Sequence, residues 1–292
     1  MASAEVRQIR RRIKSVQATM KITRAFELIA ASRIVRAQQR VRESLPYIHK
    51  LTEVIRNVGA AGGSSSHILL EQREVRTVGV LPITSDRGLA GAYNTNVLRA
   101  AESRLLELRR EGIEHRLYVV GKKAQGYFRF RGYHVRRAFL GVTDRPGYGD
   151  ARAVANHILD EYASGEIDQL DVVYNRFQSA LNQVTERVEM LPVRPPEDRE
   201  TEEAPVSYEF EPSPEEILDR ILPRYIEAGV FGMLLEASAG EHAARQRAMK
   251  AATDNARDLV KLYTRQANQA RQAEITTEIS EIVGGAEALT KG

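Results

Sequence analysis

The 292-residue chain carries 43 Lys and Arg against 39 Asp and Glu, a net charge of +4, and it has no Cys and no Trp. This length allows one large domain or two modest ones, the 42% apolar share argues against general disorder, and the lack of cysteine excludes a disulfide framework, a thiolate zinc site and a thiol nucleophile. No run of about 18 apolar residues occurs, and residues 1–12 lack the apolar stretch of a signal peptide, so we expect no membrane span and no secretory leader.

The first predicted element is a helix over residues 3–57, which contain no Gly and a single Pro, Pro46. Its early apolar residues recur at alternating spacings of three and four, which is typical of a coiled-coil seam: Val6, Ile9, Ile13, Val16 and Met20. A second stripe is predicted to continue this seam: Ile22, Phe26, Ile29, Val41, Leu45 and Ile48. Such a helix would be about 80 Å long, which exceeds the diameter of most single domains. The Gly- and Ser-rich residues 59–66 are predicted to end it.

The positive excess lies entirely at this end of the chain. Residues 1–42 hold eleven basic and two acidic residues, a net +9, whereas residues 43–212 and 213–292 carry −3 and −2. Such a segment is typical of a nucleic-acid arm, a membrane-surface helix, a helix that faces acidic protein partners, or a solvated helix face. The periodic apolar stripe within it and the nearly neutral remainder argue against nucleic acid.

The middle of the chain alternates between short apolar runs and helical patterns. We predict strands at 77–84, 117–120, 134–140, 171–177 and 185–193, and helices at 97–110, 122–131 and 151–164. This alternation predicts an α/β sandwich around a largely parallel sheet, with the last two strands as an antiparallel hairpin at one edge.

A Pro- and acid-rich linker over residues 194–212 precedes a second long helix. Ser213 at the N-cap, Pro214 at the first helical position and Glu216 form a capping box, and Pro223 is expected to kink or interrupt the first turns. The helix is predicted from about residue 225 to 283, and Gly284–Gly285 is predicted to stop it. Its predicted seam consists mostly of small residues, which let helix axes approach closely: Ala248, Ala252, Leu259, Tyr263, Gln266, Ala270 and Ala273.

Neither terminal helix can bury its stripe against the central domain alone. We therefore predict an α/β fold in which the N- and C-terminal helices form a long antiparallel two-helix coiled coil, beside a central Rossmann-like α/β domain.

One loop has a composition that suits phosphate binding. Residues 85–94 follow a predicted strand and precede a helix, as phosphate-cradling loops do. They contain two glycines but neither G-x-G-x-x-G nor G-K-[ST], and Asp86 and Arg87 could instead pair locally to shape the turn. The six histidines show no metal-ligand spacing, and no nucleophile–histidine–acid arrangement is apparent, so we expect no catalytic, metal or cofactor site in this chain.

Four sequence blocks, in order, resemble the gamma-subunit family of F-type ATP synthases over essentially the whole chain. They are residues 22–33, 85–91 and 248–255, and an Ile-Thr-x-Glu stretch followed by an acid and Gly-Ala within 275–288. In that family the terminal helices form the central shaft within a ring of three alpha and three beta subunits. The α/β domain sits at its foot, with the epsilon subunit, on the membrane ring of c subunits.

This resemblance implies a subunit without a catalytic site or cofactor that couples proton-driven rotation to ATP synthesis or hydrolysis at the beta subunits. It implies a shaft helix at 1–58, a foot domain at 76–195 and a second shaft helix at 213–292. The implied partners are the alpha, beta, epsilon and c subunits, with no nucleic acid. The implied location is peripheral, at the cytoplasmic side of a bacterial cell membrane, because no transit peptide is evident.

Residue by residue, the resemblance implies contacts with beta subunits for Arg24, Phe26, Arg245, Arg271, Gln272, Thr276 and Glu278. Tyr208 and Glu211 resemble the foot segment near the rotor ring and epsilon. Each of these residues could instead make contacts within the chain. Two rival functions remain open: a nucleotide-binding module or enzyme that uses residues 85–94, and a nucleic-acid binder that uses residues 7–42.

Overall fold

The computed structural model describes residues 4–58, 67–194 and 213–290. The chain forms two compact units, one of residues 1–30 and 245–292 and the other of residues 31–244. Two long helices, α1 (Ala4–Val58) and α5 (Pro214–Thr290), contribute to both. We call the first the helical unit and the second the α/β unit.

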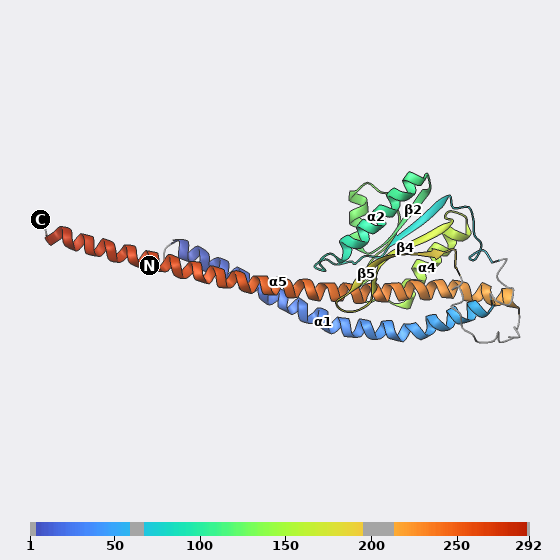
Figure 1. Cartoon of the computed structure of the whole chain (residues 1–292), viewed down its shortest axis with the longest axis horizontal. Coiled ribbons are helices and arrows are strands. Elements are labelled where there is room, and N and C mark those ends of the chain that lie inside the picture. Colours follow the sequence, from blue (N-terminus) through green and yellow to red (C-terminus); the bar gives the residue numbers. More distant parts are fainter. Residues whose placement is uncertain (1–3, 59–66, 195–212, 291–292) are drawn as a thin grey trace. The chain divides into compact units, whose positions relative to one another are not determined.

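A five-stranded sheet forms the centre of the α/β unit. Its strands are β1 (Thr77–Pro82), β2 (Glu114–Val120), β3 (Val135–Phe139), β4 (Gln169–Phe177) and β5 (Gln183–Leu191), in the order β3-β2-β1-β4-β5 (Figure 1). The first four are mutually parallel, with Val78 of β1 aligned to His115 of β2 and Gln169 of β4, and β5 runs antiparallel to β4. The predicted parallel sheet with an antiparallel edge hairpin is confirmed.

Helices cover both faces of this sheet, because alternate strand residues point to opposite sides. Val78 and Val80 pack into a core with α2 (Tyr93–Glu111) and α3 (Lys122–Phe130), whereas Leu81 packs into a second core with α4 (Tyr148–Ala163). Figure 1 shows α2 and α4 on opposite faces. The alternation of strands and helices in the sequence therefore gives the three-layer sandwich that it predicts.

The early part of α5 completes the second core. Leu218, Leu222 and Ile226 recur at every fourth residue and are almost fully buried, together with Ile55 at the end of α1. A Cβ on Gly232 would lie 3.0 Å from the Cδ1 atom of Ile48, so this glycine permits the close approach of α1 and α5 within the α/β unit.

The start of α5 follows the predicted capping pattern, but its proline does not break it. The backbone N–H of Glu216 donates to the Ser213 hydroxyl at 3.2 Å. The helix continues through Pro223, so the predicted interruption is wrong. The buried Leu222 and Ile226 flank Pro223, and their packing offsets the lost backbone hydrogen bond.

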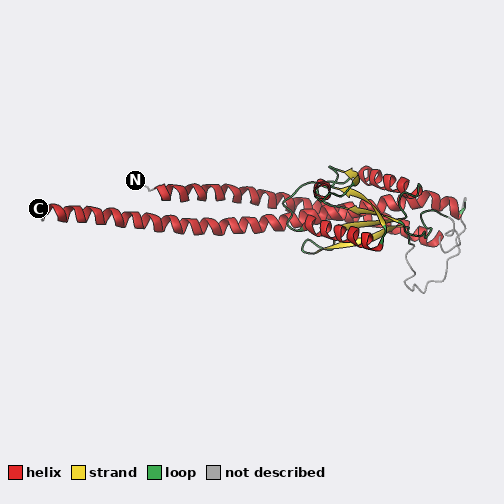
Figure 2. Ribbon diagram, turned by 90° about the horizontal axis from the view of Figure 1, so that it is seen from above, coloured by secondary structure: helices red, strands yellow, loops and turns green. Residues whose placement is uncertain are grey.

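The helical unit is an antiparallel pair made by the N-terminal part of α1 and the C-terminal part of α5, which run side by side (Figure 2). The hydroxyls of Thr23 and Thr253 are hydrogen-bonded at 2.8 Å, while a groove farther along brings Glu5 and Ile9 together with residues 266–281. Rising numbers on one helix thus meet falling numbers on the other. Val6 is buried and Ile9, Ile13, Val16 and Met20 are half-buried, which confirms the first predicted seam.

Two predicted stripes are wrong in part, because some of their residues lie one position beside the seam, whereas the predicted Val41, Ile48, Tyr263 and Ala270 are half-buried. Ile22, Phe26, Ile29 and Leu45 are 57%, 39%, 49% and 39% exposed, and the heptad spacing instead continues through Thr23, Glu27, Ala30, Ile34 and Ala37. On α5, Leu259, Gln266 and Ala273 are exposed, and the inward positions are Met249, Thr253, Ala256, Val260, Tyr263, Ala267 and Ala270. One residue is about 100° around a helix, so an apolar residue beside a seam position faces outward.

The predicted stop at Gly284–Gly285 is also wrong, because α5 remains helical to Thr290. Glycine lowers helix propensity by about 1 kcal/mol, but unlike proline it keeps its N–H donor and does not clash with the preceding turn.

Candidate partner-binding surface

Four of the residues with predicted beta-subunit contacts lie on the exposed C-terminal part of α5. Arg271, Gln272, Thr276 and Glu278 all face solvent. The Thr276 hydroxyl donates to the backbone oxygen of Gln272 at 3.0 Å, one helical turn earlier. The structure thus brings these four side chains onto neighbouring turns of one helix.

They surround an exposed apolar strip. Ile275, Ile279 and Ile282 are 46%, 56% and 71% exposed, and their spacings of four and three place them on one face; we call them the tip ridge. Arg271 and Glu278 lie within one turn of Ile275 on one side, and Gln272 and Thr276 on the other. An apolar strip with a polar rim is the composition of a protein-binding surface.

The tip ridge is exposed because it lies on the face of α5 turned away from α1, and because α1 lies beside α5 only as far as residue 281. Helix α1 begins at Ala4, and the groove between the two helices ends at residue 281 of α5. Farther on, Val283 and Leu289 are 58% and 85% exposed. Within the described part of the helical unit, α1 thus lines one face of α5 up to residue 281 and leaves the face with the tip ridge open.

Phe26 belongs to a second exposed ridge. Ile22, Phe26 and Ile29 lie at spacings of four and three, beside the seam rather than in it, and we call them the N-terminal ridge. Arg24 lies on a different face of α1, about half a turn around the helix from this ridge, with its side chain 55% exposed and one guanidinium N–H donated to Glu27 Oε1 at 2.7 Å. Arg24 and Phe26 are thus accessible on one turn of α1.

The other three residues with predicted partner contacts are not on these exposed surfaces of the described structure. Arg245 is only 9% exposed. Tyr208 and Glu211 lie outside the described residues. The sequence also missed Glu27, which occupies a seam position at 7% exposure and whose Oε2 is buried without a hydrogen-bond partner in the described structure. The continuation of the 3/4 spacing from Met20 was the signal that could have found it.

The N-terminus of α3 meets the loop of residues 85–94, and its N–H groups are already bonded within the chain. The first three N–H groups of α3 donate to the Asp86 carboxylate, the Ser85 carbonyl and the Thr84 hydroxyl, at 3.1, 3.1 and 2.9 Å. The fourth donates to the carbonyl of Gly121 at 3.3 Å. A phosphate binds a helix N-terminus through free N–H groups, and here each has an acceptor already.

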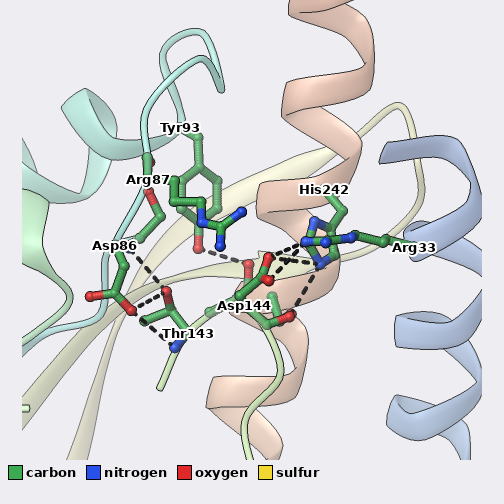
Figure 3. Close-up of polar contacts among 10 residues, drawn as sticks. Arg33, Asp86, Arg87, Tyr93, Thr143, Asp144 and His242 are labelled. Carbon is green, nitrogen blue, oxygen red and sulfur yellow. Dashed lines mark hydrogen bonds and ion pairs between the residues drawn. The ribbon is translucent and has the colours of Figure 1, made fainter. Parts of the chain in front are cut away.

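Asp86 is held on its other side by the loop after β3, not by Arg87. Its Oδ2 accepts from the Thr143 hydroxyl at 3.0 Å and from the Thr143 N–H at 3.3 Å (Figure 3). Among the described ion pairs none joins Asp86 to Arg87, whose side chain is exposed, so the alternative of a local pair is wrong. Asp86 therefore links two loops.

The crevice where nucleotides bind in related topologies is also filled. In a sheet of this order it lies at the carboxyl ends of β1 and β4, where the connections diverge to opposite sides. Tyr93 occupies this end at 5% exposure, its hydroxyl donates to the Ala237 carbonyl at 2.8 Å, and its own carbonyl accepts from Asn175 Nδ2 at 2.9 Å. The side chain of Tyr93 thus ties the sheet to α5.

Two buried carboxylates of the α/β unit accept hydrogen bonds from neighbouring side chains. Asp171 is 1% exposed and accepts from Arg104 Nε at 2.7 Å, and Glu227 accepts from the Tyr148 hydroxyl at 2.7 Å. Burial raises the pKa of Tyr148, and the hydrogen bond to Glu227 raises it further. No group of three or more potential metal ligands occurs among the described residues.

A junction that no sequence pattern announced joins α1, the loop after β3 and α5. Both Asp144 carboxylate oxygens accept from Arg33 Nη1, at 2.6 and 2.8 Å, and the Asp144 carbonyl accepts from the Ser238 hydroxyl at 3.2 Å. His242 Nε2 lies 3.3 Å from the same carbonyl (Figure 3). These contacts lie within the α/β unit and fix the loop against both helices.

Comparisons with known proteins agree with this arrangement. A sequence profile described as ATP synthase matches residues 5–289. The ATP synthase gamma chain of Acidothermus cellulolyticus is 48% identical, covering 98% of this chain and 97% of its own length, and that of a Parafrankia species is 47% identical, covering 99% of each.

Among solved structures, a chain of the Euglena gracilis mitochondrial ATP synthase superposes with a TM-score of 0.69 at 19% identity, covering 98% of this chain and 94% of that one. A chain of the central stalk and c-ring of the Tetrahymena thermophila enzyme gives a TM-score of 0.60 at 23% identity, covering 79% and 99%.

The fold, two long terminal helices around a five-stranded α/β unit, is thus that of chains in ATP synthase assemblies. The identity of 47–48% to full-length relatives then assigns the chain to a family. The chain belongs to the ATP synthase gamma chain family and is a component of that membrane-associated complex. Among the described residues, no helix is long and apolar enough to cross a bilayer.

Proposed function

We propose that this chain is the central shaft of an F-type ATP synthase, which couples proton-driven rotation of a membrane ring of c subunits to ATP synthesis or hydrolysis at catalytic beta subunits. Residues 1–58 and 213–292 serve as the shaft helices and 76–195 as the foot domain. The chain performs no chemistry itself. The observation that carries this proposal is the tip ridge with its polar rim, exposed on a helix of a gamma-family chain.

The physical basis is differential contact. A shaft with one ridge at its tip cannot touch three identical beta subunits in the same way, so it biases each toward a different conformation. A turn of the shaft changes which subunit is biased. Only this difference in interaction free energy between conformations can shift their populations.

The partner contacts follow from the exposed side chains. Arg271, Gln272, Thr276 and Glu278 offer donors and acceptors at the edge of the tip ridge. Phe26 offers an aromatic ring at the N-terminal ridge, and Arg24 offers a cation on another face of the same turn of α1. The net +9 of residues 1–42 suits acidic loops of a surrounding ring. Arg245 would reach an acidic lever of a beta subunit.

At the other end, we place Tyr208 and Glu211 against the epsilon subunit and the c-ring. The complex would then hold this chain at the cytoplasmic side of a bacterial cell membrane, as a peripheral subunit. Closure of the α3 N-terminus by Asp86 and of the sheet crevice by Tyr93 supports the absence of a nucleotide site in the foot domain.

A truncation tests this proposal. A chain that ends at residue 270 is assembled with alpha, beta, epsilon and membrane subunits, and proton-driven ATP synthesis is measured in vesicles. We expect synthesis to fall several-fold while circular dichroism shows the α/β unit still folded. A matched control replaces Leu181, 83% exposed at the β4–β5 turn, with Ala and should retain full synthesis. Undiminished synthesis and torque in the truncated complex would refute the assignment of the tip.

A further inference from the structure

A cavity of about 440 Å³ in the α/β unit is lined by four arginines that come from two separate segments. Arg33, Arg36 and Arg40 lie on consecutive turns of α1, and Arg145 lies in the loop after β3. Ser238 and His242 of α5 complete the wall. We call this the arginine cavity.

The wall also holds two carboxylates, of which one is paired with an arginine. Asp144 accepts from Arg33 through both carboxylate oxygens, at 2.6 and 2.8 Å. Glu43 accepts from Gln39 Nε2 at 2.8 Å. One arginine of the four is therefore neutralised by its partner.

The other three have no carboxylate within 4.0 Å among the described residues. Arg36 donates to the Ser32 hydroxyl at 3.0 Å, and Arg40 donates to the backbone carbonyl of Pro146. Burial lowers the pKa of Arg40, the nearby Arg145 charge lowers it further, and Glu43 only partly opposes this. The wall thus holds four arginines against two carboxylates, an excess of mutually repelling positive charge around an open volume.

The geometry of the wall is fixed before any ligand arrives. The Asp144 carbonyl accepts from the Ser238 hydroxyl at 3.2 Å, and the bidentate Arg33 contact holds the same residue from α1 (Figure 3). Arg145 directly follows Asp144, so its backbone is anchored to both helices. Preorganisation of this kind reduces the entropic cost of binding.

We propose that the arginine cavity is a binding site for a small phosphate-bearing anion. Guanidinium groups match phosphate oxygens with paired N–H donors and stay charged at any physiological pH. The volume lies within the range of small-molecule sites. A concave wall with three arginines that lie outside the described ion pairs fits a compact polyanion better than an extended acidic peptide. The site lies within the α/β unit and shares no residue with either ridge, so it goes beyond the shaft function.

Isothermal titration calorimetry on the full-length chain tests this, with inorganic phosphate, pyrophosphate and ATP as separate titrants. We expect saturable binding that weakens with salt, and the tightest titrant identifies the source of the phosphate. Arg36→Gln with Arg145→Gln should weaken binding roughly tenfold or more, because two charge-assisted donors are lost. Both side chains are exposed, so the variant should unfold at the parent temperature.

Two control variants and one control titrant complete the design. Arg99→Gln removes an exposed charge on α2, and Lys123→Gln removes an exposed amine that lies 3.5 Å from where a Cβ on Gly88 would be; neither should change affinity. No heat with any phosphate titrant, equal loss in a control variant, or binding of a short polyglutamate peptide alone would each overturn the proposal. These measurements need no ring subunits, so their failure would not touch the shaft function.

Discussion

The tip ridge gives the most direct test of the shaft function at the level of side chains. A triple variant in which Ile275, Ile279 and Ile282 are each changed to Ala loses most of the exposed apolar surface there and keeps the polar rim. Full burial of an isoleucine side chain is worth about 1.5–3 kcal/mol. These three are 46%, 56% and 71% exposed in the free chain, so a partner that covers them can gain about 1 kcal/mol from each.

The expected loss of binding free energy is therefore about 3 kcal/mol, or roughly a hundredfold in dissociation constant. The triple variant should not lose thermal stability. Exposed side chains contribute little to the folded state, and Ala is a better helix former than Ile, so the unfolding temperature should stay constant or rise slightly.

The assay is a fluorescence titration of the full-length chain with the assembled alpha–beta ring, beside a thermal unfolding curve followed by circular dichroism. Leu181→Ala serves as control, because Leu181 is 83% exposed in the α/β unit. Undiminished affinity of the triple variant, or an equal loss in the control, would show that the ridge is not the contact surface.

Three further predictions concern the α/β unit. Asp171→Ala leaves the arginine on α2 without its 2.7 Å partner and should lower the free energy of unfolding by about 3 kcal/mol in urea titrations. Gly121→Ala should cost roughly 3 kcal/mol, because its φ is +92° and the new Cβ would lie 2.5 Å from the Thr84 carbonyl oxygen; Gly112→Ala, at φ +74° with open space, should cost less in the same thermal melts. Burial raises the pKa of Glu236, so the folded state binds its proton more tightly and stability falls as pH rises from about 4.5 through the raised pKa. Glu236→Gln should therefore unfold at a higher temperature than the parent at pH 7, with an advantage that shrinks toward pH 4.5.

Periodicity was enough to predict the layers of the fold. The spacing from Val6 to Met20 identified a true seam, and short apolar runs bounded by turns identified the strands. It failed at Ile22 and Phe26 because hydropathy marks apolar residues, not the face that meets a partner. Thr23 and Glu27 hold the seam there, and both look like surface residues in a sequence.

The site was predictable only where contacts are local. Arg271 to Glu278 share turns of one helix, so the resemblance and helical geometry together predicted their common exposure. The Arg33–Asp144 pair spans 111 residues, and Asp86 meets Thr143 across 57. Such pairs depend on how loops and helices pack in three dimensions, and no spacing rule carries that information.

The hydrogen bond between the Thr23 and Thr253 hydroxyls has a consequence for how the two helices of the helical unit resist sliding under load. If α1 shifted along α5 by seven residues toward its C-terminus, Thr23 would lie opposite Val260, which has no side-chain oxygen to hydrogen-bond. A hydrogen-bonded pair of seam residues thus favours the observed alignment over this shifted one. This hydrogen bond therefore helps to keep the register of α1 and α5 fixed while the shaft transmits torque.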